Sequence, residues 1–173
     1  MLVNLSDVLT SADKTENYKA ELEMQTYHCR LGDFPIVRKK PVSLKATNIG
    51  SGKAELDVQT QVVLMMSCDR CLKDVEYTFD ISFSIEVLAP SIETEEPNED
   101  NFMEGYQLNV ESLISRELLM NWPMKVLCKT DCKGICKVCG KDLNTGECEC
   151  DAFVPDPRMA VIKDIFNANN KEV

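Results

Sequence analysis

The stretch that decides the fold lies in the middle of the chain, where residues 56–87 read LDVQTQVVLMMSCDRCLKDVEYTFDISFSIEV. Apolar and polar side chains alternate along 56–66 and again along 75–87, where thirteen positions keep one parity. A period of two predicts strands with one buried and one solvated face. Between the two runs lies Ser67-Cys68-Asp69-Arg70-Cys71, so we expect a long antiparallel hairpin with a Cys-x2-Cys motif at its tip.

The residues before the hairpin favour strands as well. Residues 18–30 alternate in the same way, and residues 34–46 predict a further strand that Pro41 interrupts. Residues 49–52 read IGSG, a combination typical of a turn. Residues 1–15 fit a short helix. The N-terminal half is therefore predicted to be rich in antiparallel strands.

Helices are predicted after the hairpin. Residues 90–105 lose the periodicity, and residues 86–104 carry seven acidic residues and no basic one, which predicts an exposed, mobile loop. Asn109 can cap a helix that Pro123 ends, and Asp156-Pro157 can start a final helix. Apolar residues line one face of each helix: Val110, Leu113, Ile114, Leu118 and Trp122 in the first, and Met159, Ile162, Ile165 and Phe166 in the second.

The nine cysteines are the most informative feature of the composition. Eight of them form pairs at short spacing: Cys68 with Cys71, Cys128 with Cys132, Cys136 with Cys139, and Cys148 with Cys150. We expect a reducing compartment, because residues 1–7 lack the basic and apolar regions of a secretory signal. In such a compartment clustered cysteines bind metal more often than they form disulfides.

Four pairs are enough for two closed zinc sites with four thiolates each. The four cysteines of residues 136–150 predict a compact zinc ribbon. Cys68 and Cys71 would form the second site with Cys128 and Cys132. The alternative is that Cys128 and Cys132 serve the ribbon, and that Cys68 and Cys71 are free thiols. We expect two zinc ions per chain, both structural.

Other uses of these groups are less favoured. The motif at residues 68–71 lacks the βαβ context of a thioredoxin-like redox centre. A catalytic zinc commonly has His or carboxylate ligands and an open position, and the sole histidine, His28, lies on a predicted strand. Cys29 is expected to pack as a small hydrophobic residue. The sequence has no Gly-rich phosphate loop and no Gly-x-Ser-x-Gly motif, so we expect neither an enzyme nor a small-molecule substrate.

These patterns predict an α+β fold. An antiparallel β-rich N-terminal part with a long hairpin precedes helices and a Cys-rich zinc module in the C-terminal part. We divide the chain into a β-rich domain with a zinc-knuckle hairpin at 1–90 and an acidic loop at 91–106. Residues 107–173 then supply a helix, the Cys-rich module and a C-terminal helix that pack on the same domain.

Charge is distributed unevenly along the chain. The formal net charge of −10 argues against holding nucleic acid by bulk charge alone. One basic cluster lies within residues 30–53. In the other, lysines recur every four residues across the Cys-rich segment, at Lys125, Lys129, Lys133, Lys137 and Lys141. These lysines could contact RNA phosphates. The simpler interpretation is that they offset thiolate charge and keep the surface solvated.

Residues 132–144, CKGICKVCGKDLN, resemble the YceD family, a bacterial and plastid family linked to accumulation of large-subunit ribosomal RNA. Cys148-x-Cys150, Asp156-Pro157-Arg158 and the hairpin motif CDRCL at 68–72 resemble it too. Some members of that family lack the ribbon and keep the central Cys-x2-Cys with His or Cys near positions 128 and 132. The resemblance therefore implies one site from the pairs at 68–71 and 128–132, and the ribbon as a separate site.

The resemblance also implies a non-enzymatic role in large ribosomal subunit biogenesis, exerted by binding either the large-subunit rRNA precursor or a ribosomal protein. The alternative is a zinc-dependent protein-interaction module in another pathway, such as transcription. The longest apolar run, Val62–Met66, has five residues, whereas a membrane span needs about 20. We therefore expect a cytoplasmic protein with no membrane partner.

Overall fold

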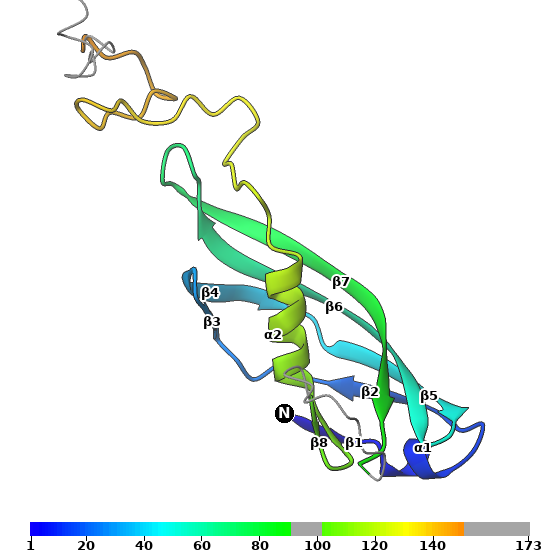
Figure 1. Ribbon diagram of the computed structural model, residues 1–173. Helices are drawn as coiled ribbons and strands as arrows, with labels where there is room; N and C mark the ends of the chain where they lie inside the picture. The colour runs from blue at the N-terminus through cyan, green and yellow to red at the C-terminus, as the bar shows by residue number, and fades with distance from the viewer. Residues whose placement is uncertain (91–101, 151–173) are drawn as a thin grey trace, which may run out of the picture. The chain divides into compact units, whose positions relative to one another are not determined.

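The computed structural model describes residues 1–90 and 102–150 of the 173-residue chain (Figure 1). They fall into two compact units. Unit 1 contains Met1–Cys68 and Lys73–Val126, and unit 2 contains the hairpin tip, Asp69–Leu72, and the Cys-rich segment from Leu127 onward. The predicted domain boundaries, and the packing of the Cys-rich module on the same domain, stay predictions.

Unit 1 is built on a six-stranded sheet in which neighbouring strands run antiparallel. The strands are β2 (Thr15–Ala20), β3 (Thr26–Cys29), β4 (Gly32–Lys39), β5 (Val42–Gly50), β6 (Lys53–Ser67) and β7 (Asp74–Leu88). Strand β6 pairs with β7 along its whole length, and its other edge pairs first with β5 and then with β4. The strand-rich, antiparallel character expected from the sequence is confirmed.

The β6–β7 hairpin is continuous from the pair Lys53–Leu88 to the pair Ser67–Asp74 (Figure 1). Its side chains alternate as the sequence indicates, because successive residues of a strand point to opposite faces. Ala54, Leu56 and Val58 are fully buried on one face. The predicted turn before β6 is also present, with Ser51 and Gly52 both at positive φ, as a two-residue hairpin loop requires.

The run at residues 18–30 differs from the single strand that its alternation suggests. Strand β2 ends at Ala20 and β3 begins only at Thr26. Between them, the backbone N–H groups of Glu23 and Met24 donate to Glu111 Oε1 at 2.7 and 3.1 Å instead of to a neighbouring strand. The carboxylate comes from α2, so a partner distant in sequence interrupts the strand.

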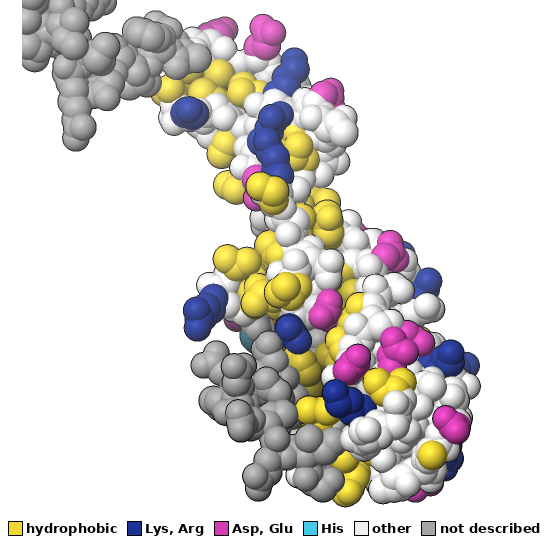
Figure 2. All heavy atoms as spheres, turned by 45° about the vertical axis from the view of Figure 1, so that its right-hand side comes forward, with side chains coloured by type: hydrophobic (Ala, Val, Ile, Leu, Met, Phe, Trp, Pro, Cys, Tyr) yellow, Lys and Arg dark blue, Asp and Glu magenta, His cyan; other side chains and the backbone are white. Residues whose placement is uncertain are grey.

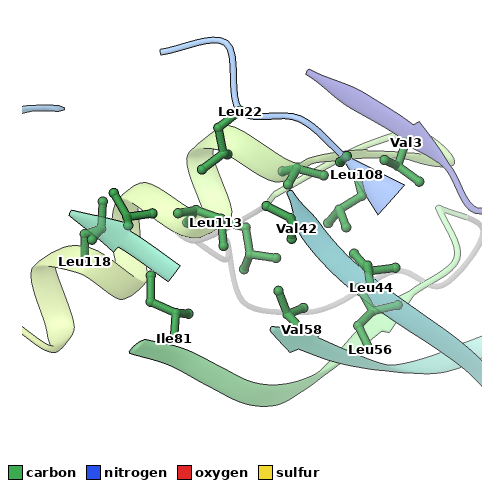
Figure 3. Close-up of a cluster of buried hydrophobic side chains, with 14 of the residues drawn as sticks. Val3, Leu22, Val42, Leu44, Leu56, Val58, Ile81, Leu108, Leu113 and Leu118 are labelled. Carbon is green, nitrogen blue, oxygen red and sulfur yellow. The ribbon is translucent and has the colours of Figure 1, made fainter. Parts of the chain in front are cut away.

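Helix α2 (Val110–Met120) supplies the layer that covers the sheet (Figure 1). Asn109 caps it as predicted, since its side chain accepts the N–H of Ser112 at 3.2 Å. The buried face of α2 packs on apolar side chains of the sheet, and Figure 3 shows Leu113 and Leu118 among Val42, Leu44, Leu56, Val58 and Ile81. Trp122, just after the helix, stacks edge-on against Phe34 at 4.8 Å between ring centroids.

Short elements close the rest of unit 1. A three-stranded sheet joins β1 (Leu2–Asn4), β9 (Gln107–Asn109) and β8 (Met103–Glu104), and α1 (Ser6–Thr10) follows β1. Val3 and Leu108 of this small sheet belong to the same core (Figure 3). Most of the predicted acidic loop and all of the predicted final helix lie outside the described residues. Within residues 1–90 and 102–150, no helix combines the length and apolarity needed to cross a membrane.

Candidate metal centres

The first sulfur cluster gathers Cys68, Cys71, Cys128 and Cys132, whose Sγ atoms all lie within 4.8 Å of one another. The Sγ atoms of Cys71 and Cys128 are 3.5 Å apart. Four sulfurs at 2.3 Å from a central zinc would stand about 3.8 Å from one another in a tetrahedron. The cluster therefore has the size of a single four-coordinate ion.

Arg70, at the hairpin tip, holds the backbone that follows Cys132. Its Nη1 donates to the carbonyl of Cys132 at 2.6 Å, and its own carbonyl accepts the N–H of Ile135 at 3.2 Å. Gly134 lies at φ +80°, and a Cβ there would stand 2.9 Å from the Arg70 carbonyl oxygen. Only glycine fits such an approach without a shift of the backbone.

The surroundings of Cys132 favour the thiolate. Burial opposes ionisation, but hydrogen bonds from the Asn144 side chain and the Gly134 N–H outweigh it, so the pKa of Cys132 is lowered. The Asn144 amide nitrogen lies 3.4 Å from the sulfur. Its oxygen accepts the N–H of Lys133 at 2.9 Å, which fixes the direction of the amide. Such a donor stabilises a ligating thiolate from outside the coordination shell.

The second cluster gathers Cys136, Cys139, Cys148 and Cys150, again with all Sγ atoms within 4.8 Å. Its first pair lies in a tight turn. The Val138 N–H donates to the Cys136 sulfur at 3.4 Å, and the Gly140 N–H donates to the Cys136 carbonyl at 2.9 Å. Gly140 is at φ +73°. An isolated bridge between Ile135 and Asp142 closes the base of this turn.

The four thiols of the second cluster cannot ionise independently. N–H donors from Cys139 and Val138 lower the pKa of Cys136 to about 6. The Cys139 sulfur acts in the opposite direction on Cys150: their hydrogen bond, together with burial and the negative charge of Cys139, raises the pKa of Cys150 to about 12. A cation at the centre would remove this mutual repulsion and release the remaining protons.

The two clusters differ in exposure. Three cysteines of the first cluster are buried and only Cys128 is exposed. In the second cluster only Cys136 is buried, and Cys139 is exposed. Both groups could hold a metal ion, and four thiolates in a tetrahedron suit zinc. The more exposed group would exchange its ion more readily.

The structure brings together the eight cysteines that the spacing singled out, in the pairing that the family resemblance implied. Cys29 joins neither group, and its Sγ lies 3.6 Å from the Gly32 carbonyl. His28 is exposed beside Asp33. Sequence patterns alone do not point to the roles of Arg70 and Asn144. The side chain of Asp142 accepts the backbone N–H of Asn144 in a local turn. This turn is the one local pattern in the sequence that could have pointed to Asn144.

All five lysines proposed for RNA contact are exposed, with Lys125 in unit 1 and the other four in unit 2. Figure 2 shows dark blue side chains close together on one face of the Cys-rich unit. Lys141 Nζ donates to the Glu147 carbonyl at 2.8 Å, and Lys129 Nζ lies 3.9 Å from Asp131. The lysines are therefore accessible, and whether they contact RNA stays a prediction.

The fold and the two sulfur clusters define a strand-rich protein with two groups of four cysteines, each of which could hold a metal ion. Comparison with known proteins narrows this class, because the model of the YceD family, described as large ribosomal RNA subunit accumulation protein, matches residues 56–166. The chain belongs to the YceD family. The matched region contains the β6–β7 hairpin from Leu56 onward and all eight paired cysteines.

A curated relative shares more of the chain. The uncharacterized protein YlbN of Bacillus subtilis (strain 168) is 25% identical over 138 residues, which cover 79% of this chain and 80% of YlbN. No solved structure matches the chain. The family description therefore carries the functional information, and the geometry of the clusters adds the chemistry.

Proposed function

We propose that this chain is a non-enzymatic zinc-binding factor in large ribosomal subunit biogenesis. It promotes accumulation of large-subunit rRNA by binding the rRNA precursor or a ribosomal protein. The observation that carries the proposal is the pair of four-cysteine clusters in a member of the YceD family. The compartment implied is the cytoplasm, where bacterial ribosomes assemble.

The ligand sets support structural rather than catalytic zinc. Each cluster offers four thiolates, so a tetrahedral ion held by all of them has no open position for water or substrate. A structural zinc contributes its binding energy to folding, on the order of 10–16 kcal/mol in small zinc modules. Unit 2 contains only short turns and one isolated bridge among its described residues, so it depends on such a contribution.

The zinc clusters would also fix the lysine surface. Lys133 and Lys137 stand directly beside the ligands Cys132 and Cys136, and Lys141 follows Gly140 in the second turn. A rigid backbone keeps their ammonium groups together, which lowers the entropic cost of binding several phosphates. The whole chain has a net charge of −10, so these lysines would be the part of unit 2 that attracts RNA.

Depletion of the protein in its native host tests the proposal. We expect a selective fall of large-subunit relative to small-subunit rRNA, which the intact chain restores and a variant lacking Cys71 and Cys139 does not. An unchanged ratio with depletion verified would contradict the role in biogenesis. Neutralising Lys133, Lys137 and Lys141 separates the two kinds of partner, because only RNA binding would lose affinity together with its steep salt dependence.

A zinc-dependent interaction module in another pathway, such as transcription, is the second candidate. Two exposed apolar side chains favour it: Leu72, next to Cys71, is 65% exposed, and Val138, between Cys136 and Cys139, is 55% exposed. Apolar side chains at the tips of zinc turns are suited to protein contacts. Copurification with a transcription complex and normal rRNA levels after depletion would favour this alternative.

A further inference from the structure

The face of the main sheet opposite the core is polar over most of its length. The register aligns Lys19, Ser43, Gln59 and Ser82 in one row across β2, β5, β6 and β7. The neighbouring row consists of Asn17, Lys45, Asp57 and Ser84. Residues in direct register point to the same face, so these rows form one polar surface.

Three hollows join along this face. The first, about 890 Å³, crosses the two rows, and the second, about 450 Å³, shares Ser43, Gln59 and Ser82 with it. The third, about 560 Å³, shares Lys40 and Gln61 with the second and extends to Arg38. We call these joined hollows the sheet-face groove. It is open to solvent and lies wholly in unit 1.

The sheet-face groove is basic in an acidic protein. The register places four of its basic lining residues on this face, Lys19, Arg38, Lys40 and Lys45, together with two acidic ones, Asp57 and Asp80. Lys39 also borders the groove, but it is in register with the buried Val62 and its Nζ donates to the Met24 carbonyl at 2.8 Å. Both acids already have partners: Ser84 Oγ donates to Asp57 and Gln61 Nε2 donates to Asp80, each at 2.5 Å. Arg38 pairs with Glu76 on the same face.

Two of the cations have no such partner. Neither Lys19 nor Lys40 forms an ion pair with an acid in the part of the chain that the structure describes. Both side chains are exposed. The groove thus offers two unpaired ammonium groups beside hydroxyl and amide groups of Ser43, Gln59 and Ser82.

This combination fits one kind of ligand. Ammonium groups bind phosphates, and Ser, Asn and Gln side chains bind phosphate oxygens and sugar hydroxyls. Proteins that bind single strands on a sheet usually stack bases on aromatic side chains. Among the described residues of β2, β5, β6 and β7, the aromatic ones (Tyr18, Tyr77, Phe79 and Phe83) all fall in register with the core face. The groove therefore suits a sugar–phosphate backbone whose bases are already stacked.

We propose that the sheet-face groove binds the sugar–phosphate backbone of double-helical RNA. This inference rests on the proposed function in rRNA accumulation, and it adds a binding surface in unit 1 to the lysines of unit 2. Recognition would depend on the shape of the duplex and on its 2′-hydroxyls, and only weakly on sequence, because the groove offers nothing that reaches base edges in a defined pattern.

The test measures binding of the full zinc-loaded chain to three fluorescent probes: an RNA duplex of about 16 base pairs, the DNA duplex of the same sequence, and one RNA strand. The groove variant is Lys19→Gln with Lys40→Gln. The control variant, Arg30→Gln with Lys53→Gln, removes the same charge from exposed or half-exposed positions that do not line the groove. Unchanged thermal unfolding confirms that both variants fold.

We expect the groove variant to bind duplex RNA about tenfold more weakly than the intact chain and to lose about two units of salt slope, while the control stays within about twofold. Equal losses in both variants would overturn the inference, and so would a preference for the single strand or for DNA. Binding that only the unit 2 lysines control would refute the groove and keep the proposed function. Absence of RNA binding, with rRNA still lost on depletion, would refute the groove and point to a protein partner.

Discussion

Replacing Gly134 with alanine would test the close contact between the hairpin tip and the segment after Cys132. Both Gly134 and Gly140 have a left-handed backbone, at φ +80° and +73°, which costs a non-glycine residue about 1–2 kcal/mol. At Gly140 an added Cβ would meet nothing within 4 Å, so Gly140→Ala should show this cost alone. Gly140→Ala is therefore the matched control.

At Gly134 the new Cβ would stand 2.9 Å from the Arg70 carbonyl oxygen. Backbone must move to relieve the clash, and the hydrogen bonds that Arg70 makes to Ile135 and Cys132 would be strained or lost. Each is worth about 0.5–1.5 kcal/mol, and more where the charged guanidinium donates. Gly134→Ala should therefore cost about 1–3 kcal/mol more than Gly140→Ala.

Because metal binding and folding of unit 2 are coupled, this difference should appear in metal affinity. Competition between the protein and a chromophoric chelator would measure it. Each variant is compared with the intact chain. We expect the loss of zinc affinity at the first cluster of Gly134→Ala to be about 10- to 100-fold larger than the loss at the second cluster of Gly140→Ala. Equal effects of the two substitutions would refute the close approach of Gly134 to Arg70.

Three further outcomes are expected. By elemental analysis the intact chain should contain two zinc ions per chain and the Cys139→Ser variant one, and the 128–150 segment of the variant should lose its structure. An unchanged ratio of zinc to protein would contradict the assignment of the second cluster. A chelator should remove zinc in two phases, first from the more exposed cluster of Cys136, so protection of Cys71 from alkylation should outlast that of Cys139; simultaneous loss would count against two separate sites. Hydrogen bonds from Glu23 and Met24 outweigh the effect of burial and hold the pKa of Glu111 below its usual 4.5. The contribution of this carboxylate to folding stability is therefore complete above pH 4.5 and is lost as the pH falls through the lowered pKa. The stability gap between the intact chain and Glu111→Gln, about 1–2 kcal/mol at neutral pH, should therefore close as the pH falls below 4.5 in denaturant titrations. A gap independent of pH would show that the carboxylate charge is not what matters.

The parts of the fold that the sequence predicted depend on local patterns. The β6–β7 hairpin follows from side-chain alternation around a short turn, and the Asn109 cap follows from a contact three residues away. The break between β2 and β3 was not predictable, because it depends on Glu111, 88 residues from Glu23. Strand periodicity describes which face a residue occupies and contains no information on such a distant acceptor.

The candidate site shows the same limit. Spacing was enough to select the eight cysteines, since each pair is local. Arg70 was hidden because its partner, the Cys132 carbonyl, is 62 residues away. The sheet-face groove was hidden for a related reason: the sequence shows a basic cluster within residues 30–53, but only the register adds Lys19 from β2 and places Asp57 beside Lys45.

The first sulfur cluster has a topological consequence. A metal shared by Cys71 and Cys128 would close a ring of the intervening chain, since these residues are 57 positions apart. Removing that much freedom from the unfolded chain is worth about 4 kcal/mol, as for a disulfide of the same span. The ring contains β7 and α2. A protease cut within it would therefore leave two fragments that the bound ion still links, in addition to the packing of β7 and α2 in unit 1, and a chelator would remove that link.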